Sequence, residues 1–219
     1  MANAAVHRRN REKRVVKWVV IVGTLFLAVQ AYQFKGRGGT HGSPDINANV
    51  AEAVSLKDDA GARGAFLAAY PVFMHPRCMN CHPAGDAPLQ GDNSRPHEQN
   101  VKRGPDGRGK YALKCVDCHQ QANLEGENMP PGSPNWHLPP PSMRMVFQGK
   151  TPGELCRQVK DPRRNGGKTL AQLIRHVSED KLVLWGWDPG EGRTKPPLSH
   201  GEFAQKMWEW VNKGAICPD

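Results

Sequence analysis

Two copies of one five-residue pattern, C-x-x-C-H, carry the clearest chemistry in this chain of 219 residues. Two thiols three positions apart can add to the two vinyl groups of one porphyrin, and the His that follows then faces the iron as its proximal ligand. The pattern therefore predicts two covalently bound haem c groups. The attachment and ligand residues are Cys78, Cys81 and His82 in the first motif and Cys115, Cys118 and His119 in the second.

The same four cysteines also have the spacing of a tetrahedral zinc site built from two C-x-x-C pairs. A zinc site gives no reason for a His directly after both pairs, and it fits poorly with an exported chain. We therefore interpret the cysteines as haem attachment sites.

Through these six residues the chain resembles the c-type cytochromes. The resemblance implies an electron carrier rather than an enzyme, in an oxidising compartment, with a mainly α, cytochrome c-like fold and extensive loops. In addition, the stretch from His75 to Pro218 is similar to small dihaem cytochromes associated with bacterial molybdenum hydroxylases, among them isoquinoline 1-oxidoreductase subunits. That similarity implies a molybdenum hydroxylase as a redox partner.

The first 34 residues have the composition of a targeting segment. Basic residues precede an apolar run from Trp18 to Val29, and Val29-Gln30-Ala31 is a candidate cleavage site. With its flanks, the run in residues 15–34 approaches the length that spans a bilayer, which favours an inner-membrane anchor over the alternative of a cleaved signal peptide. Either outcome places residues 35–219 in the periplasm.

The charge of the chain gives little support to nucleic-acid binding. Of the formal charge of +9, the targeting segment with its six basic residues and one Glu carries +5. The remainder is nearly balanced by the four propionates of two haems, and no basic patch with interleaved aromatic residues is present. We therefore expect redox proteins, and not nucleic acid, as partners.

Two cysteines, Cys156 and Cys217, are left over after haem attachment. Spare thiols in an oxidising compartment most often pair, so we expect a disulfide that joins the C-terminus to the helix carrying Cys156.

The rest of the chain divides into a Gly-rich linker at residues 35–58 and a dihaem domain at residues 59–219. A helix is expected from Asp59 through Tyr70, limited or kinked by Pro71. Residues 83–110 should be loop, and six prolines in residues 129–141 predict an extended segment. Capping signals predict three further helices, which begin after Thr151, Thr169 and Ser199.

Only 32 residues separate the two motifs. That length is too short for one self-standing haem domain followed by another, so both haems should share one core and exchange electrons quickly.

The distal ligand decides between carrier and catalyst, because two protein ligands saturate the iron whereas one leaves a position for chemistry. Spacing after the motifs suggests His97 and His137, and His176 lies at the edge of an apolar helix face. Met143 and Met145 follow the proline-rich run, where single-haem cytochromes often carry a Met ligand. We predict His97 and His176 first, then Met145 and His137.

These observations favour electron transfer between a periplasmic or membrane dehydrogenase and the respiratory chain. Two alternatives stay open at this point. One is a peroxidase-like haem enzyme with an open iron position, and the other is a cytochrome subunit permanently docked on a molybdenum hydroxylase.

Overall fold

The computed structural model describes residues 58–219. The predicted targeting segment at residues 1–34 and all of the predicted linker except Asp58 lie outside the described residues. Among the helices of residues 58–219, none has the length and apolar character needed to cross a membrane. These residues belong to one compact unit that is mainly helical, with long loops and little strand.

The helix before the first motif is α3 (Asp59–Met74), one turn longer than the sequence predicts. The side chain of Asp58 accepts a hydrogen bond from the backbone N–H of Gly61 and so caps its first turn. Pro71 lies inside the helix without ending it. Pro71 is on the exposed side, where the carbonyl left without a partner can be hydrated.

The three helices predicted from capping signals are confirmed. They are α5 (Pro152–Lys160), α6 (Leu170–Glu179) and α8 (His200–Asn212). Each begins with a complete capping box, in which the hydroxyl of Thr151, Thr169 or Ser199 accepts from the backbone N–H three residues later and a Glu or Gln side chain accepts in return.

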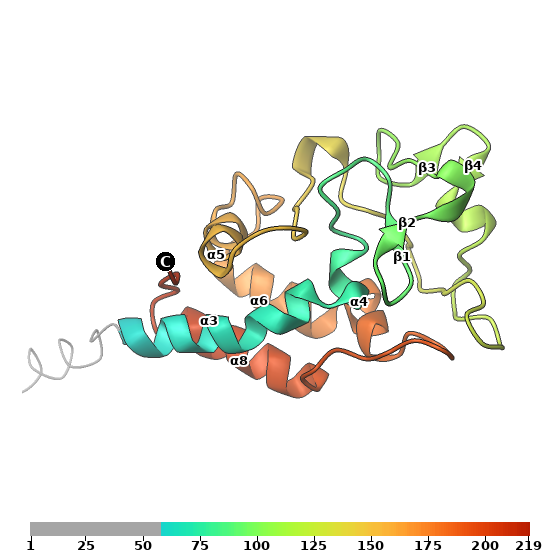
Figure 1. The fold of residues 1–219 in the computed structure, drawn as a ribbon. Coiled ribbons are helices and arrows are strands. Elements are labelled where there is room, and N and C mark those ends of the chain that lie inside the picture. Colours follow the sequence, from blue (N-terminus) through green and yellow to red (C-terminus); the bar gives the residue numbers. More distant parts are fainter. Residues whose placement is uncertain (1–57) are drawn as a thin grey trace, which may run out of the picture. The chain divides into compact units, whose positions relative to one another are not determined.

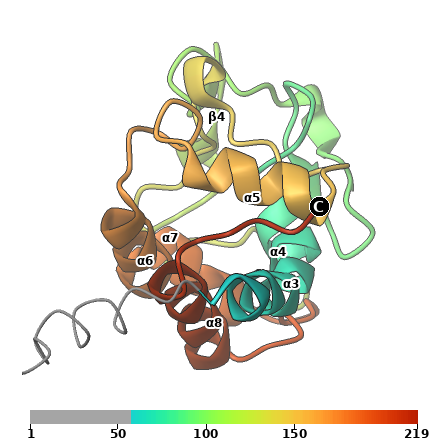
Figure 2. The same ribbon diagram turned by 90° about the vertical axis from the view of Figure 1, so that its left-hand side faces the viewer.

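The helices pack into one apolar core around the pair α3 and α8, which lie side by side in both ribbon views (Figures 1 and 2). Phe66 of α3 contacts Trp210 of α8 with ring centroids 5.2 Å apart, and both side chains are fully buried. Phe73 makes edge-on contacts to Phe203 of α8 and to Phe147 in the loop before α5. This core positions the end of α3, from which the first motif follows.

Short elements occupy the other end of the unit, where the strands β1–β4 gather (Figure 1). Residues 83–110, predicted as loop, contain the hairpin β1–β2, and a second hairpin, β3–β4, leads into the second motif. Trp185–Trp187 forms a 3-10 turn. The remaining elements are α4 (Pro76–Met79), β1 (Leu89–Gln90), β2 (Arg95–Pro96), η1 (Glu98–Asn100), β3 (Gly109–Lys110), β4 (Leu113–Lys114), η2 (Cys115–Asp117), η3 (Pro141–Met143), α7 (Lys181–Leu184) and η4 (Trp185–Trp187).

The predicted disulfide is confirmed. The Sγ atoms of Cys156 and Cys217 are 2.08 Å apart, and Cys156 is fully buried in the core. Figure 2 shows the C-terminal segment leaving α8 and crossing to α5, which is the connection that the bridge fixes.

Removal of this bridge should destabilise the protein without touching the motifs. Because 61 residues separate the two cysteines in sequence, the chain-entropy model gives a loss of about 4 kcal/mol in the free energy of unfolding for the double variant Cys156→Ala/Cys217→Ala. Denaturant unfolding measures it. As a control, a thiol reductant should lower the denaturant midpoint of the wild type and leave that of the double variant unchanged. Equal denaturant midpoints for the wild type and the variant without reductant would contradict the prediction.

Candidate functional site

The first motif begins on a single helical turn held at the end of α3. His75 is the N-cap of α4 and Pro76 occupies its first position, so the chain changes direction and restarts as a helix that contains Cys78. The backbone N–H groups of Cys81 and His82 then donate to carbonyls three residues earlier. The motif is therefore folded tightly enough for two thiols and one imidazole to face the same space.

The imidazole of His82 is fixed by a segment far along the chain. Its Nδ1 is 2.7 Å from the carbonyl oxygen of Met145, and its ring stacks on Phe147 with centroids 3.8 Å apart and planes 12° apart. The carbonyl of His82 in turn accepts from the backbone N–H of Phe147 at 2.9 Å. The ring orientation is thus set by one hydrogen bond and one aromatic stack.

The second motif follows the β3–β4 hairpin directly. Gly109 has φ +91°, and a Cβ atom there would lie 2.2 Å from the carbonyl oxygen of Leu113, so the tight pairing requires glycine. The carboxylate of Asp117 accepts from the backbone N–H of Lys114 at 3.0 Å and closes the short turn η2. His119 then donates its backbone N–H to Cys115 at 2.8 Å.

The imidazole of His119 repeats the arrangement seen at His82. Its Nδ1 is 2.7 Å from the carbonyl oxygen of Pro131, and its ring stacks on Trp136 with centroids 4.5 Å apart and planes 5° apart. Both residues come from the proline-rich segment 129–141, whose extended backbone leaves its carbonyls available for such bonds.

This shared arrangement determines the tautomer of both rings. A backbone carbonyl can only accept, so Nδ1 of each ring carries the proton and Nε2 keeps a lone pair. Burial lowers the pKa of His82 to about 4, against the opposing effect of its hydrogen bond to Met145, and it also lowers the pKa of His119. Both imidazoles are therefore neutral near pH 7, with Nε2 ready to bind a metal.

His82 faces a cavity of about 560 Å³ between the core helices and the proline-rich segment. Its wall contains Cys78 and Cys81, and most of the other lining residues are apolar, among them Phe73, Val159, Leu173, Val177 and Phe203. His137, His176 and Met145 line the same cavity.

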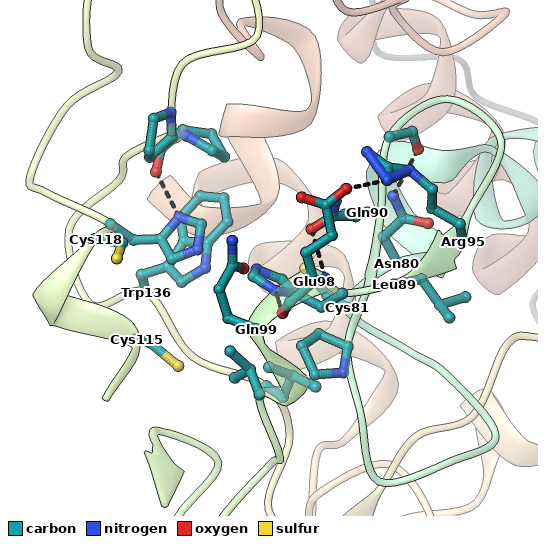
Figure 3. Close-up of a pocket in the computed structure, with 18 of the residues that line it drawn as sticks. Asn80, Cys81, Leu89, Gln90, Arg95, Glu98, Gln99, Cys115, Cys118 and Trp136 are labelled. Carbon is teal, nitrogen blue, oxygen red and sulfur yellow. Dashed lines mark hydrogen bonds and ion pairs between the residues drawn. The ribbon is translucent and has the colours of Figure 1, made fainter. Parts of the chain in front are cut away.

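His119 faces a second cavity, of about 940 Å³. Its wall contains Cys115 and Cys118 together with the aromatic side chains Trp136 and Trp185. Figure 3 shows Cys115, Cys118 and Trp136 on one side of this cavity and Cys81 of the first motif on another. Cys81 and Arg77 line both cavities, so the two spaces adjoin each other.

His97 and His119 both line the larger cavity, and their rings lie edge to face with centroids 6.2 Å apart and planes 68° apart. With metal–imidazole bonds of about 2.0–2.1 Å and about 1.1 Å from ring nitrogen to centroid, two imidazoles on opposite sides of one metal ion have centroids about 6.4 Å apart. Nδ1 of His97 is bound to the carbonyl of Glu98 at 2.7 Å, which leaves Nε2 with its lone pair. The spacing of the two rings matches that of a ligand pair.

His176 and His137 stand on the wall of the smaller cavity with His82. Nδ1 of His176 contacts the carboxylate of Asp180 at 3.3 Å, and Nδ1 of His137 contacts the carbonyl of Asn135 at 2.6 Å, so Nε2 of each is available. Burial lowers the pKa of His176, with Asp180 opposing. His200, on the core helix α8, does not have a free Nε2, because this atom donates to the carbonyl of Val177 at 2.9 Å.

The backbone of Met145 contacts His82 at Nδ1, the ring nitrogen opposite the free Nε2. Its carbonyl binds Nδ1, the nitrogen that points away from the position a metal on Nε2 would take. The distal assignments of His97, His176, Met145 and His137 stay predictions. The structure adds that His97 shares a cavity with the second motif and His137 with the first, the reverse of their order along the chain.

Three of the four motif thiols are held in the protonated form by burial in the protein without a bound group. Burial raises the pKa of Cys78 to about 12 and that of Cys81 to about 11, and it also raises the pKa of Cys115. Within residues 58–219, no group of three or more His, Cys, Asp or Glu side chains is placed to hold a metal ion by itself. Cys78 lines the smaller cavity, Cys115 and Cys118 line the larger one, and Cys81 lines both.

Sequence reasoning missed several residues of these sites. The stacking partners Phe147 and Trp136 and the carbonyls of Met145 and Pro131 have no pattern that marks them in advance. The proline-rich segment was the one available signal, since an extended stretch next to a C-x-x-C-H motif leaves its backbone carbonyls free to accept hydrogen bonds. Arg77 was missed because a basic residue before a motif is expected at the surface, whereas it is buried.

Comparisons with protein-family models, with curated proteins and with solved structures found no match to this chain.

Proposed function

We propose that this protein is an electron-transfer protein that carries two covalent haem c groups. The observation that carries the proposal is the repeated geometry of the two motifs. In each, two cysteines and the Nε2 of a neutral His face one cavity, and the other ring nitrogen donates to a backbone carbonyl. Such a hydrogen bond at Nδ1 is the usual support of a metal-ligating imidazole.

The cavities fit the proposed cofactor in size and in chemistry. Volumes of about 560 and 940 Å³ lie in the range of cofactor sites, about 300–1,000 Å³. The first is walled mainly by core side chains such as Phe73 and Phe203, which suit a flat apolar ring. The second offers Trp136 and Trp185, whose rings contact each other at 4.8 Å.

We propose His97 as the distal ligand opposite His119 and His176 as the distal ligand opposite His82. The 6.2 Å spacing of the rings of His97 and His119 supports the first pair. For the second pair, α6 holds His176 on the cavity wall, and Asp180 on the same helix end orients its ring. Met145 is a weaker candidate since its backbone is engaged on the proximal side of His82.

Two protein ligands on each iron would make the sites carriers of single electrons rather than centres of catalysis. When bound, the haems supply reversible one-electron oxidation and reduction; the protein's own residues orient them, hold them in an apolar wall and keep the ligating rings neutral. Because Cys81 lines both cavities, the two cofactors would lie next to each other, which supports electron exchange between them.

We further propose that the protein acts in the periplasm, anchored through residues 15–34, between a dehydrogenase and the respiratory chain. A molybdenum hydroxylase stays the proposed partner on the resemblance in sequence.

Removal of the attachment thiols tests the number of cofactors. The variants Cys78→Ala/Cys81→Ala and Cys115→Ala/Cys118→Ala should each retain about one of two covalent haems per chain, because each motif attaches its own group. Haem content after denaturation, relative to protein, is the measurement. The variant Cys156→Ala/Cys217→Ala is the matched control and should retain two. A protein that binds stoichiometric zinc and no covalent haem would overturn the proposed function.

Ligand variants test the carrier assignment. His97→Ala and His176→Ala should each convert one iron from six-coordinate low spin to a form that binds carbon monoxide when reduced, because each removes one distal nitrogen. His200→Ala is the control, since Nε2 of His200 is engaged by Val177, and its visible spectrum should match the wild type. Carbon monoxide binding by the native wild type would instead favour an open iron and an enzyme.

A further inference from the structure

Arg77 is a buried charge placed between the two cavities. It precedes Cys78 in the turn α4, its side chain is 2% exposed, and it lines both cavities. Buried arginines are rare unless their donors are satisfied, because removing a guanidinium from water is costly. Its surroundings therefore indicate what it binds.

The protein satisfies Arg77 only in part. One Nη atom pairs with Asp92, whose second oxygen accepts from the backbone N–H of Thr194 at 3.0 Å. The guanidinium also lies over the ring of Trp185, 6.0 Å from its centroid. Nε is buried and has no hydrogen-bond partner among residues 58–219. A buried donor without a partner costs about 1–3 kcal/mol, and because Arg77 lines both cavities, a group bound in either one is placed to supply the acceptor.

A second buried arginine, Arg103, has a different role. Its two Nη atoms donate to the carbonyls of Pro139 and Gly85, so it joins two loops. Its Nε, like that of Arg77, is buried without a hydrogen-bond partner among the described residues, but Arg103 lines neither cavity. Arg193 lines only the larger cavity, where its Nη atoms donate to Pro189 and Met129. Among these three arginines, Arg77 alone faces both spaces.

We propose that Arg77 is a positioning residue shared by both redox sites: its free donor binds a carboxylate of a bound porphyrin, and its charge stabilises the reduced state at both irons. This inference rests on the proposed function, because it requires the two haems. Reduction adds one electron to each iron, and a positive charge held in a low-dielectric interior favours the state with the added negative charge. Arg77 therefore raises both reduction potentials.

Substitution of Asp92 should shift the reduction potentials in the direction opposite to substitution of Arg77. Its carboxylate is partly exposed and neutralises part of the Arg77 charge, and its pKa is lowered, since its hydrogen bonds to Thr194 and the charge of Arg77 outweigh its burial. Removal of the Asp92 charge leaves Arg77 less compensated. The two substitutions should consequently move the potentials in opposite directions, which a purely structural ion pair would not do.

The experiment is a spectroelectrochemical titration of the matured full-length protein and its variants. Arg77→Gln should lower both midpoint potentials by at least about 59 mV, the equivalent of a tenfold change in the ratio of oxidised to reduced iron in a one-electron couple. Arg77→Lys keeps the charge and should recover most of the potential. Asp92→Asn should raise both potentials, and Arg193→Gln should lower only that of the haem at the second motif.

Haem content, measured on the same samples, separates the two levels of the proposal. If the wild type holds no covalent haem, the proposed function fails. If the variants hold two haems and Arg77→Gln and Asp92→Asn leave both potentials within error of the wild type, only the role of Arg77 is overturned. If Arg77→Gln does not mature with haem, Arg77→Lys and Asp92→Asn test the same role. Higher midpoint potentials in Asp92→Asn support the role of Arg77, and unchanged potentials contradict it.

Discussion

The hydrogen bond from Nδ1 of each motif His to a backbone carbonyl is the constraint on which the site depends. It fixes the tautomer, aims Nε2 into a cavity and ties the motif to a distant segment of the chain. For His82 the acceptor is Met145, 63 residues away, and for His119 it is Pro131, 12 residues away. Both acceptors lie in or just after the proline-rich run. This segment therefore supports both sites at once, although it has almost no regular structure.

The helices provide the rigid frame to which this segment is attached. The packing of α3 against α8 fixes the start of the first motif, and Phe147 connects the ring of His82 to the same core through Phe73. The disulfide joins the C-terminus to α5, which follows the proline-rich segment closely. Two buried arginines complete this frame: Arg77 lies between the cavities and pairs with Asp92, and Arg103 joins two loops through the carbonyls of Pro139 and Gly85.

Local signals in the sequence predicted the helices and the disulfide well, because capping boxes, apolar periodicity and the count of spare cysteines are short-range or arithmetic patterns. The six motif residues are also recognised from their spacing, and their role in haem attachment stays a prediction. Partners across the fold could not be predicted in this way. Counting along the chain suggests His97 for the first motif and His137 for the second, yet His97 lines the larger cavity with His119, and His137 lines the smaller one with His82. The aromatic stacks, the carbonyl acceptors and the burial of Arg77 depend on tertiary packing that no local pattern encodes.

The central claim is that two irons are held next to each other in this fold, each between imidazoles from distant segments. Anomalous diffraction at the iron absorption edge, from crystals of the matured protein, tests it most directly. The account predicts two iron peaks, one between Nε2 of His119 and Nε2 of His97 and one at Nε2 of His82 with His176 opposite. A single metal peak among the four motif cysteines, or two irons without these imidazoles, would contradict it.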